Sequence, residues 1–70
     1  MGTWNYRIVD RTLENAGDPL FQICEVYYND KGEPTGFTDA CVMAEDVDGI
    51  RGELSRMLAA LDKPVVTFSN

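Results

Sequence analysis

The sequence predicts an α+β domain in which a three-stranded antiparallel sheet is followed by one amphipathic helix packed on one face. Three observations lead to this prediction. Large apolar and polar residues alternate between Trp4 and Val9, which is the period of a half-buried strand. A turn signal at residues 29–32 separates two further strand-like stretches. From Val47 onward, the apolar residues recur at helical spacing.

The first strand is expected to run from Trp4 to Leu13, where the alternating pattern ends. The next six residues, ENAGDP at 14–19, collect nearly every residue type that forms turns, so the chain should reverse there. The stretch LFQICEVYY (Leu20–Tyr28) is then the second strand.

The residues Asn-Asp-Lys-Gly at 29–32 are typical of a type I turn closed by a left-handed glycine. They predict a β-hairpin over Leu20–Met43. With residues 30–32 as the loop, Asn29 faces Glu33, and this pair sets the register of both arms.

In this register Cys24 lies opposite Thr38, and Cys41 lies opposite Phe21. The two cysteines then point to opposite faces of the sheet, so we expect two free thiols. Both faces carry apolar side chains. One face has Leu20, Cys24, Val26, Ala40 and Val42, and the other has Phe21, Ile23, Tyr27, Phe37 and Met43 together with the acids Glu25 and Asp39.

The helix is predicted from a stripe of apolar residues that falls within about a 100° arc. Asp46 is a suitable N-cap, and Pro64 should end the helix after Lys63. Gly49 and Gly52 should each weaken the helix by ~1 kcal/mol relative to alanine. The stripe consists of Val47, Ile50, Leu54, Met57, Leu58 and Leu61.

The last apolar segment, Val65–Phe68, is short and β-branched. It either adds a fourth strand at a sheet edge or lies as an extended tail. No repeat or linker is visible, so residues 1–70 are expected to form a single small domain.

Composition and charge disfavour several classes of function. The chain is 44% hydrophobic, which is too apolar for a disordered protein, and its formal charge of −6 would repel nucleic acid and anionic membranes. The first ten residues lack the charged start and apolar core of a signal peptide, and the sequence contains no apolar run of membrane-spanning length. We therefore expect a cytoplasmic protein that binds neither nucleic acid nor membrane directly.

The residue types also disfavour catalysis and metal binding. The sequence has no histidine, which removes the commonest general base and zinc ligand, and its two cysteines are not closely spaced. Asp46-Val47-Asp48-Gly49 imitates part of a calcium loop, but Ala44 and Ser55 stand where anchoring carboxylates are needed. We predict no enzyme, no cofactor and no metal site. The one enzymatic alternative is a pair of catalytic carboxylates, Glu25 and Asp39, which are expected to be diagonal neighbours on one sheet face.

A single helix can cover only one face of such a sheet, which leaves aromatic residues on the other face exposed. The leading hypothesis is a non-enzymatic interaction module that uses Tyr27 and Phe37 as anchors to bind a protein partner or a second copy of itself. Tyr28 points to the opposite face. The alternative is an acidic inhibitor that mimics nucleic acid or acts like an antitoxin on a basic partner. Its steering residues would be Glu25, Asp39, Glu45, Asp46 and Asp48.

Four stretches together resemble a family of short, uncharacterised bacterial proteins: WNYR at 4–7, EVYY at 25–28, GFTD at 36–39 and LSRMLAALDKPVV at 54–66. The family has no assigned activity, so the resemblance implies an architecture and a bacterial or phage setting. Phe37 departs from its pattern, in which tryptophan is usual. The predicted order of elements is also similar to that of HicB-like antitoxins, an analogy of topology that implies binding to a basic toxin.

Overall fold

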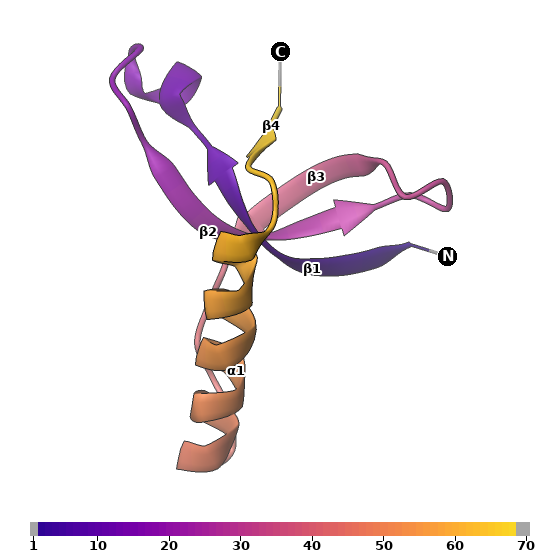
Figure 1. Cartoon of the computed structure of the whole chain (residues 1–70), viewed down its shortest axis with the longest axis vertical. Coiled ribbons are helices and arrows are strands. Elements are labelled where there is room, and N and C mark those ends of the chain that lie inside the picture. The colour runs from indigo at the N-terminus through magenta and orange to yellow at the C-terminus, as the bar shows by residue number, and fades with distance from the viewer. Residues whose placement is uncertain (1, 69–70) are drawn as a thin grey trace.

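The computed structural model describes residues 2–68 and confirms the α+β class (Figure 1). Four strands form one curled sheet in the order β3-β2-β1-β4, and one helix extends from it. The elements are β1 (Thr3–Asp10), the 3₁₀ helix η1 (Thr12–Asn15), β2 (Phe21–Tyr28), β3 (Pro34–Asp39), α1 (Val47–Ala59), the 3₁₀ helix η2 (Ala60–Asp62) and β4 (Val66–Thr67).

Strands β1 and β2 pair in antiparallel fashion along eight residues each, from Thr3 opposite Tyr28 to Asp10 opposite Phe21. The first strand is shorter than predicted and does not reach Leu13. The carboxylate of Asp10 accepts a hydrogen bond of 2.9 Å from the backbone N–H of Thr12, which favours a turn over a continued strand. The chain then reverses within residues 14–19, as expected.

The predicted turn after β2 is confirmed. Gly32 has a φ of 78°, and its N–H donates to the carbonyl oxygen of Asn29 at 3.0 Å. The N–H of Asn29 in turn donates to the carbonyl oxygen of Glu33 at 3.0 Å, so these two residues face each other.

The register beyond this turn differs from the prediction by one residue. Tyr28 pairs with Pro34 but Tyr27 pairs with Gly36, so Thr35 forms a β-bulge. As a result, Cys24 lies opposite Asp39 instead of Thr38. Because side chains alternate with a period of two, one extra residue moves every later side chain of β3 to the other face.

The core consists of two clusters on opposite faces of the sheet. The first joins the sheet to the helix and contains Tyr6, Met57 and Ala60, with Ile23 and Ala40 packed against them. The second lies on the other face and contains Val9, Cys24 and Val26, bordered by Tyr28, Phe37 and Phe68. Strand β4 completes this second face, because Val66 is buried and pairs in parallel with Val9. The segment at 65–68 thus provides a fourth, edge strand.

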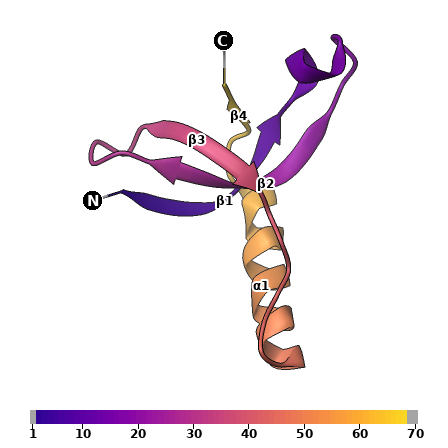
Figure 2. The same ribbon diagram turned by 180° about the vertical axis from the view of Figure 1, so that it is seen from behind.

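Helix α1 begins at the predicted cap, where the carboxylate of Asp46 accepts a hydrogen bond of 2.7 Å from the N–H of Gly49. It projects from the sheet and meets it at the C-terminal end (Figures 1 and 2). There Met57 and Ala60 are buried on the face that carries Tyr6. A connecting segment, residues 40–46, runs beside the helix from β3 to the helix start (Figure 2).

The two helix glycines differ in their surroundings, which corrects the expectation that each simply weakens the helix. A Cβ on Gly49 would lie 2.6 Å from the Cβ of Ala44 in the connecting segment. A Cβ on Gly52 would meet only the end of the Arg56 side chain, at 3.8 Å. Gly49 therefore permits the close approach of the connecting segment.

We accordingly expect opposite effects from two alanine substitutions, measured by urea unfolding. Gly52→Ala should raise the free energy of unfolding by up to ~1 kcal/mol, because alanine favours the helix. Gly49→Ala should lower it by about 1–3 kcal/mol, because the added methyl group displaces the connecting segment. Equal stabilisation by both substitutions would show that the segment does not pack on the helix.

Candidate interaction surfaces

The structure separates the five residues that the sequence placed at a candidate site. Tyr27 and Glu25 lie on the sheet face that the helix contacts. Phe37 and Asp39 lie on the other face, with Tyr28, because Phe37 is opposite Val26 and Asp39 is opposite Cys24. The prediction that Tyr27 and Phe37 form one aromatic surface is wrong, and the bulge at Thr35 is the reason.

Tyr27 has a different aromatic partner, Trp4, which lies directly opposite it on β1. Trp4 is 50% exposed and Tyr27 is 36% exposed. The hydroxyl of Tyr27 donates to Glu25 at 3.0 Å and lies 3.2 Å from the hydroxyl of Thr38. We call these four residues (Trp4, Glu25, Tyr27 and Thr38) the Trp4–Tyr27 patch. This patch can be predicted only if the pairing of residues between β1 and β2 is known. The turn residues at 14–19 do not define that register.

A groove of about 510 Å³ lies beside this patch, between β1 and the helix. The Trp4 ring meets the Tyr6 ring edge-on, with centroids 5.3 Å apart and planes at 86°. The patch and the groove therefore share Trp4. The groove is lined by Trp4, Asn5 and Tyr6 from the strand and by Glu53, Arg56, Ala59 and Lys63 from the helical side.

A polar link crosses the floor of this groove. The Tyr6 hydroxyl donates to Glu53, which also forms an ion pair with Arg56 one helical turn later. The hydrogen bond to Glu53 and burial raise the pKa of Tyr6 to about 12. The same hydrogen bond and Arg56 lower the pKa of Glu53. At neutral pH the pair is thus a neutral donor and a charged acceptor, which suits a fixed link between sheet and helix.

The opposite face is largely occupied by its own side chains. The Phe37 ring lies against the Phe68 ring, with centroids 5.0 Å apart, and the Arg11 guanidinium carbon is 5.1 Å from the Phe37 centroid. Tyr28 is also engaged, because its hydroxyl donates to Asn5 at 2.7 Å and accepts from Arg7 at 3.0 Å. Phe37 and Tyr28 are therefore poor candidates for contact with a partner.

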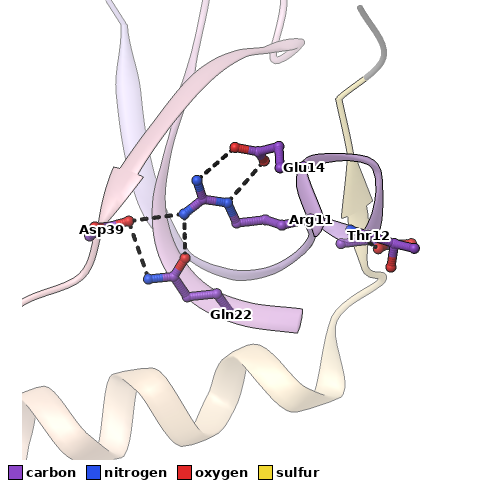
Figure 3. A network of polar contacts seen from close by, with 6 residues as sticks. Arg11, Thr12, Glu14, Gln22 and Asp39 are labelled. Atoms are coloured by element: carbon purple, nitrogen blue, oxygen red, sulfur yellow. Dashed lines mark hydrogen bonds and ion pairs between the residues drawn. The ribbon is translucent and has the colours of Figure 1, made fainter. Parts of the chain in front are cut away.

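Arg11 organises the polar network at the edge of this face (Figure 3). It donates to Glu14 through Nε at 2.9 Å and Nη2 at 2.7 Å, and Nη1 donates to Gln22 at 2.6 Å. Asp39 accepts from Arg11 and Gln22, both at 3.2 Å. The hydrogen bonds from Arg11 lower the pKa of Glu14. Asp39 is thus part of an intramolecular network at the surface, where its side chain is 74% exposed.

The predicted carboxylate neighbours Glu25 and Asp39 do not come together, because they lie on opposite faces. Within residues 2–68, no three His, Cys, Asp or Glu side chains are grouped so that they could hold a metal ion. Cys24 is buried and Cys41 is exposed beyond the end of β3, and both are free thiols, as predicted. No helix in the described part of the chain is long and apolar enough to cross a membrane.

A third surface was not anticipated from the sequence, because the apolar side of the helix was expected to pack on the sheet. Met57 is buried by the sheet, but the outer part of the predicted stripe remains exposed. We call this part the helix stripe. It consists of Val47, Leu54, Leu58 and Leu61, whose exposed fractions range from 52% to 75%.

Comparisons with known proteins return no match, since no family model, curated protein or solved structure is significantly similar to this chain. The resemblances noted in the sequence therefore stay predictions.

Proposed function

We propose that this protein is a non-enzymatic interaction module of the bacterial cytoplasm that binds another protein through the Trp4–Tyr27 patch. The observation that carries the proposal is the cross-strand pairing of Trp4 with Tyr27, with both rings partly exposed on the same sheet face. Tryptophan and tyrosine dominate the binding energy of protein interfaces, because each buries a large ring and keeps a polar group for hydrogen bonding.

The surroundings of the pair also suit a binding surface. Two strands fix the backbone of both residues, and contacts to Tyr6, Glu25 and Thr38 orient their side chains. A preorganised surface loses little side-chain entropy on binding. The adjoining groove offers a concave site for a side chain of the partner, with the cations Arg56 and Lys63 at its helical wall.

This proposal predicts that Tyr27→Ala weakens partner binding without unfolding the domain, because Tyr27 is partly exposed and outside both core clusters. The wild type and the variant are compared by pull-down from bacterial lysate, and the recovered protein is then titrated with each by calorimetry. We expect an affinity loss of at least ~10-fold, as is usual for an aromatic anchor.

Phe21→Ala is the matched control, because Phe21 is an exposed aromatic at the far end of the same strand. It should retain binding. Loss of binding in Phe21→Ala and not in Tyr27→Ala would contradict the assignment of the patch. Unfolding of Tyr27→Ala would show that Tyr27 is a core residue.

The acidic-inhibitor hypothesis has one structural observation in its favour. Glu45, Asp46 and Asp48 are exposed together at the free end of the projecting helix. The hypothesis predicts that the association rate with a basic partner falls steeply as salt increases. Glu25 and Asp39 cannot belong to the same steering surface, because they lie on opposite faces of the sheet. Capture that persists unchanged at moderate salt would count against it.

A further inference from the structure

We propose that two copies of this chain form a dimer by packing their helix stripes against each other, antiparallel, about a two-fold axis near Leu54. This inference goes beyond the proposed function, because it uses a different surface and leaves the Trp4–Tyr27 patch available to another protein. Four observations support it: the spacing of the stripe, the extent of uncovered surface, the distribution of charge and the position of the sheet relative to the helix.

The spacing along the helix is that of a helix–helix seam. Val47 and Leu54 in α1 and Leu61 in the following η2 recur every seven residues, and Leu58 lies between the last two. Met57, at the intervening step, is buried by the sheet and is not part of the seam. Leu54 is the midpoint of this series, with one apolar residue seven positions away on each side. Such a pattern is self-complementary when a second copy runs in the opposite direction, as a two-fold interface requires.

The chain exposes more surface than a compact protein of its mass. Its accessible surface is 5132 Å², whereas a folded monomer of 7.8 kDa is expected to expose about 4,400 Å². The excess of roughly 700 Å² is close to the ~800 Å² per partner that a standard stable interface buries. The radius of gyration is 13.1 Å, against about 11 Å expected for 70 residues, because the helix projects from the sheet and the curled strands also spread outward (Figure 1).

The charges at the two ends of the helix favour the antiparallel arrangement. Glu45, Asp46 and Asp48 lie at its beginning, while its end carries one cation, Lys63, beside one acid, Asp62. Arg56 lies close to the axis and is paired with Glu53 of its own helix. Antiparallel packing places the acidic end of each copy beside the more basic end of the other, and it also opposes the helix dipoles. Parallel packing would bring the acidic ends of the two copies together.

The shape of the molecule leads to the same arrangement. The sheet lies at the C-terminal end of the helix and the other end is free (Figures 1 and 2). Two helices packed in parallel would force both sheets to the same end of the pair. In the antiparallel dimer each sheet lies beside the free end of the partner's helix, where a second sheet does not compete for the space.

Sedimentation equilibrium of Leu54→Glu tests the dimer. The two introduced carboxylates would face each other at the axis, so we expect the dimer dissociation constant to rise at least ~100-fold. Leu13→Glu is the matched control, because Leu13 is 69% exposed but lies in η1, away from the stripe, and it should not change the mass. Circular dichroism establishes that each variant is folded.

Cross-linking tests the antiparallel orientation of the two helices without introducing a charged residue between them. In a Cys41→Ser background, one chain carries Val47→Cys and a second carries Leu61→Cys, and a short bis-maleimide is added. Cys24 is buried and should not react. We expect 47–61 products and few 47–47 products.

Three results would overturn the dimer: a wild type that stays monomeric at millimolar concentration, a Leu54→Glu mass equal to that of the wild type, or a predominance of 47–47 products. The second result could be accompanied by loss of the dimer in Tyr27→Ala. In that case the Trp4–Tyr27 patch would be the self-association surface. Failure of the dimer with partner binding intact leaves the proposed function standing, so the two proposals fail separately.

Discussion

Replacement of Val26 by aspartate is expected to leave the chain unfolded at 25 °C. Val26 is fully buried at the centre of β2, where it packs with Val9 and Cys24. A carboxylate at this position loses its water among apolar side chains, at a cost of several kcal/mol, and the cation on this face of β1, Arg7, already donates to Tyr28 and to the carbonyl oxygen of Pro64. A domain of 70 residues has a total stability of only about 4–10 kcal/mol. The measurement is far-ultraviolet circular dichroism with the dispersion of amide proton shifts.

Val42→Asp is the control for this substitution, because Val42 lies in the connecting segment and is partly exposed. It introduces the same charge and should remain folded. A folded Val26→Asp, with shifts close to those of the wild type, would mean that the second cluster is not a core.

The second large effect is expected for Tyr6→Ala, which should detach the helix from the sheet. Tyr6 is buried against Met57 and Ala60, and its hydroxyl donates to Glu53. Loss of the ring leaves a cavity, so the free energy of unfolding should fall by about 3–5 kcal/mol. Because this cluster joins the helix to the sheet, amides of α1 should lose protection from hydrogen exchange more than those of β1 and β2.

Tyr6→Phe separates the packing of the ring from its hydrogen bond. It keeps the ring in the cluster and removes only the hydroxyl that donates to the charged Glu53, so the expected loss is about 1.5–3 kcal/mol. If Tyr6→Ala left the exchange of α1 amides unchanged, the helix would be stable without the first cluster. The proposal that Tyr6 holds the helix against the sheet would then be wrong.

Local signals in the sequence predicted the elements themselves. The turn at residues 29–32 formed because Gly32 takes a positive φ, and the helix began at Asp46 because its carboxylate caps the N–H of Gly49. The edge strand at Val66 follows from a short β-branched run. Each of these features depends on a few neighbouring residues, so a single sequence is sufficient to predict them.

The candidate site could not be predicted in the same way. Apolar residues occupy both faces of β2, so a shift of one residue in β3 leaves the hydrophobic pattern equally acceptable. The bulge at Thr35 therefore had no visible signature, yet it moved Phe37 and Asp39 away from Tyr27 and Glu25. The pairing of Trp4 with Tyr27 is a long-range contact that the turn composition alone does not define.

The sequence also did not define what packs against the apolar side of the helix. Its apolar stripe shows which side is to be buried but does not identify what covers that side. The glycine at position 49, which the sequence marks as a weakness, instead lets Ala44 of the connecting segment pass close to the helix. The helix is held by Met57, Ala60 and the hydrogen bond from Tyr6 to Glu53, so the remainder of the stripe is left for a second molecule.

The most direct test of the account is the molar mass of the wild-type chain in solution, measured by sedimentation equilibrium from micromolar to millimolar concentration. The central claim is that the surface left exposed by the projecting helix is a contact between two copies of this chain. It predicts a mass that rises from 7.8 kDa to twice that value as the concentration increases. A mass of 7.8 kDa at every concentration, from a chain that circular dichroism shows to be folded, would contradict it.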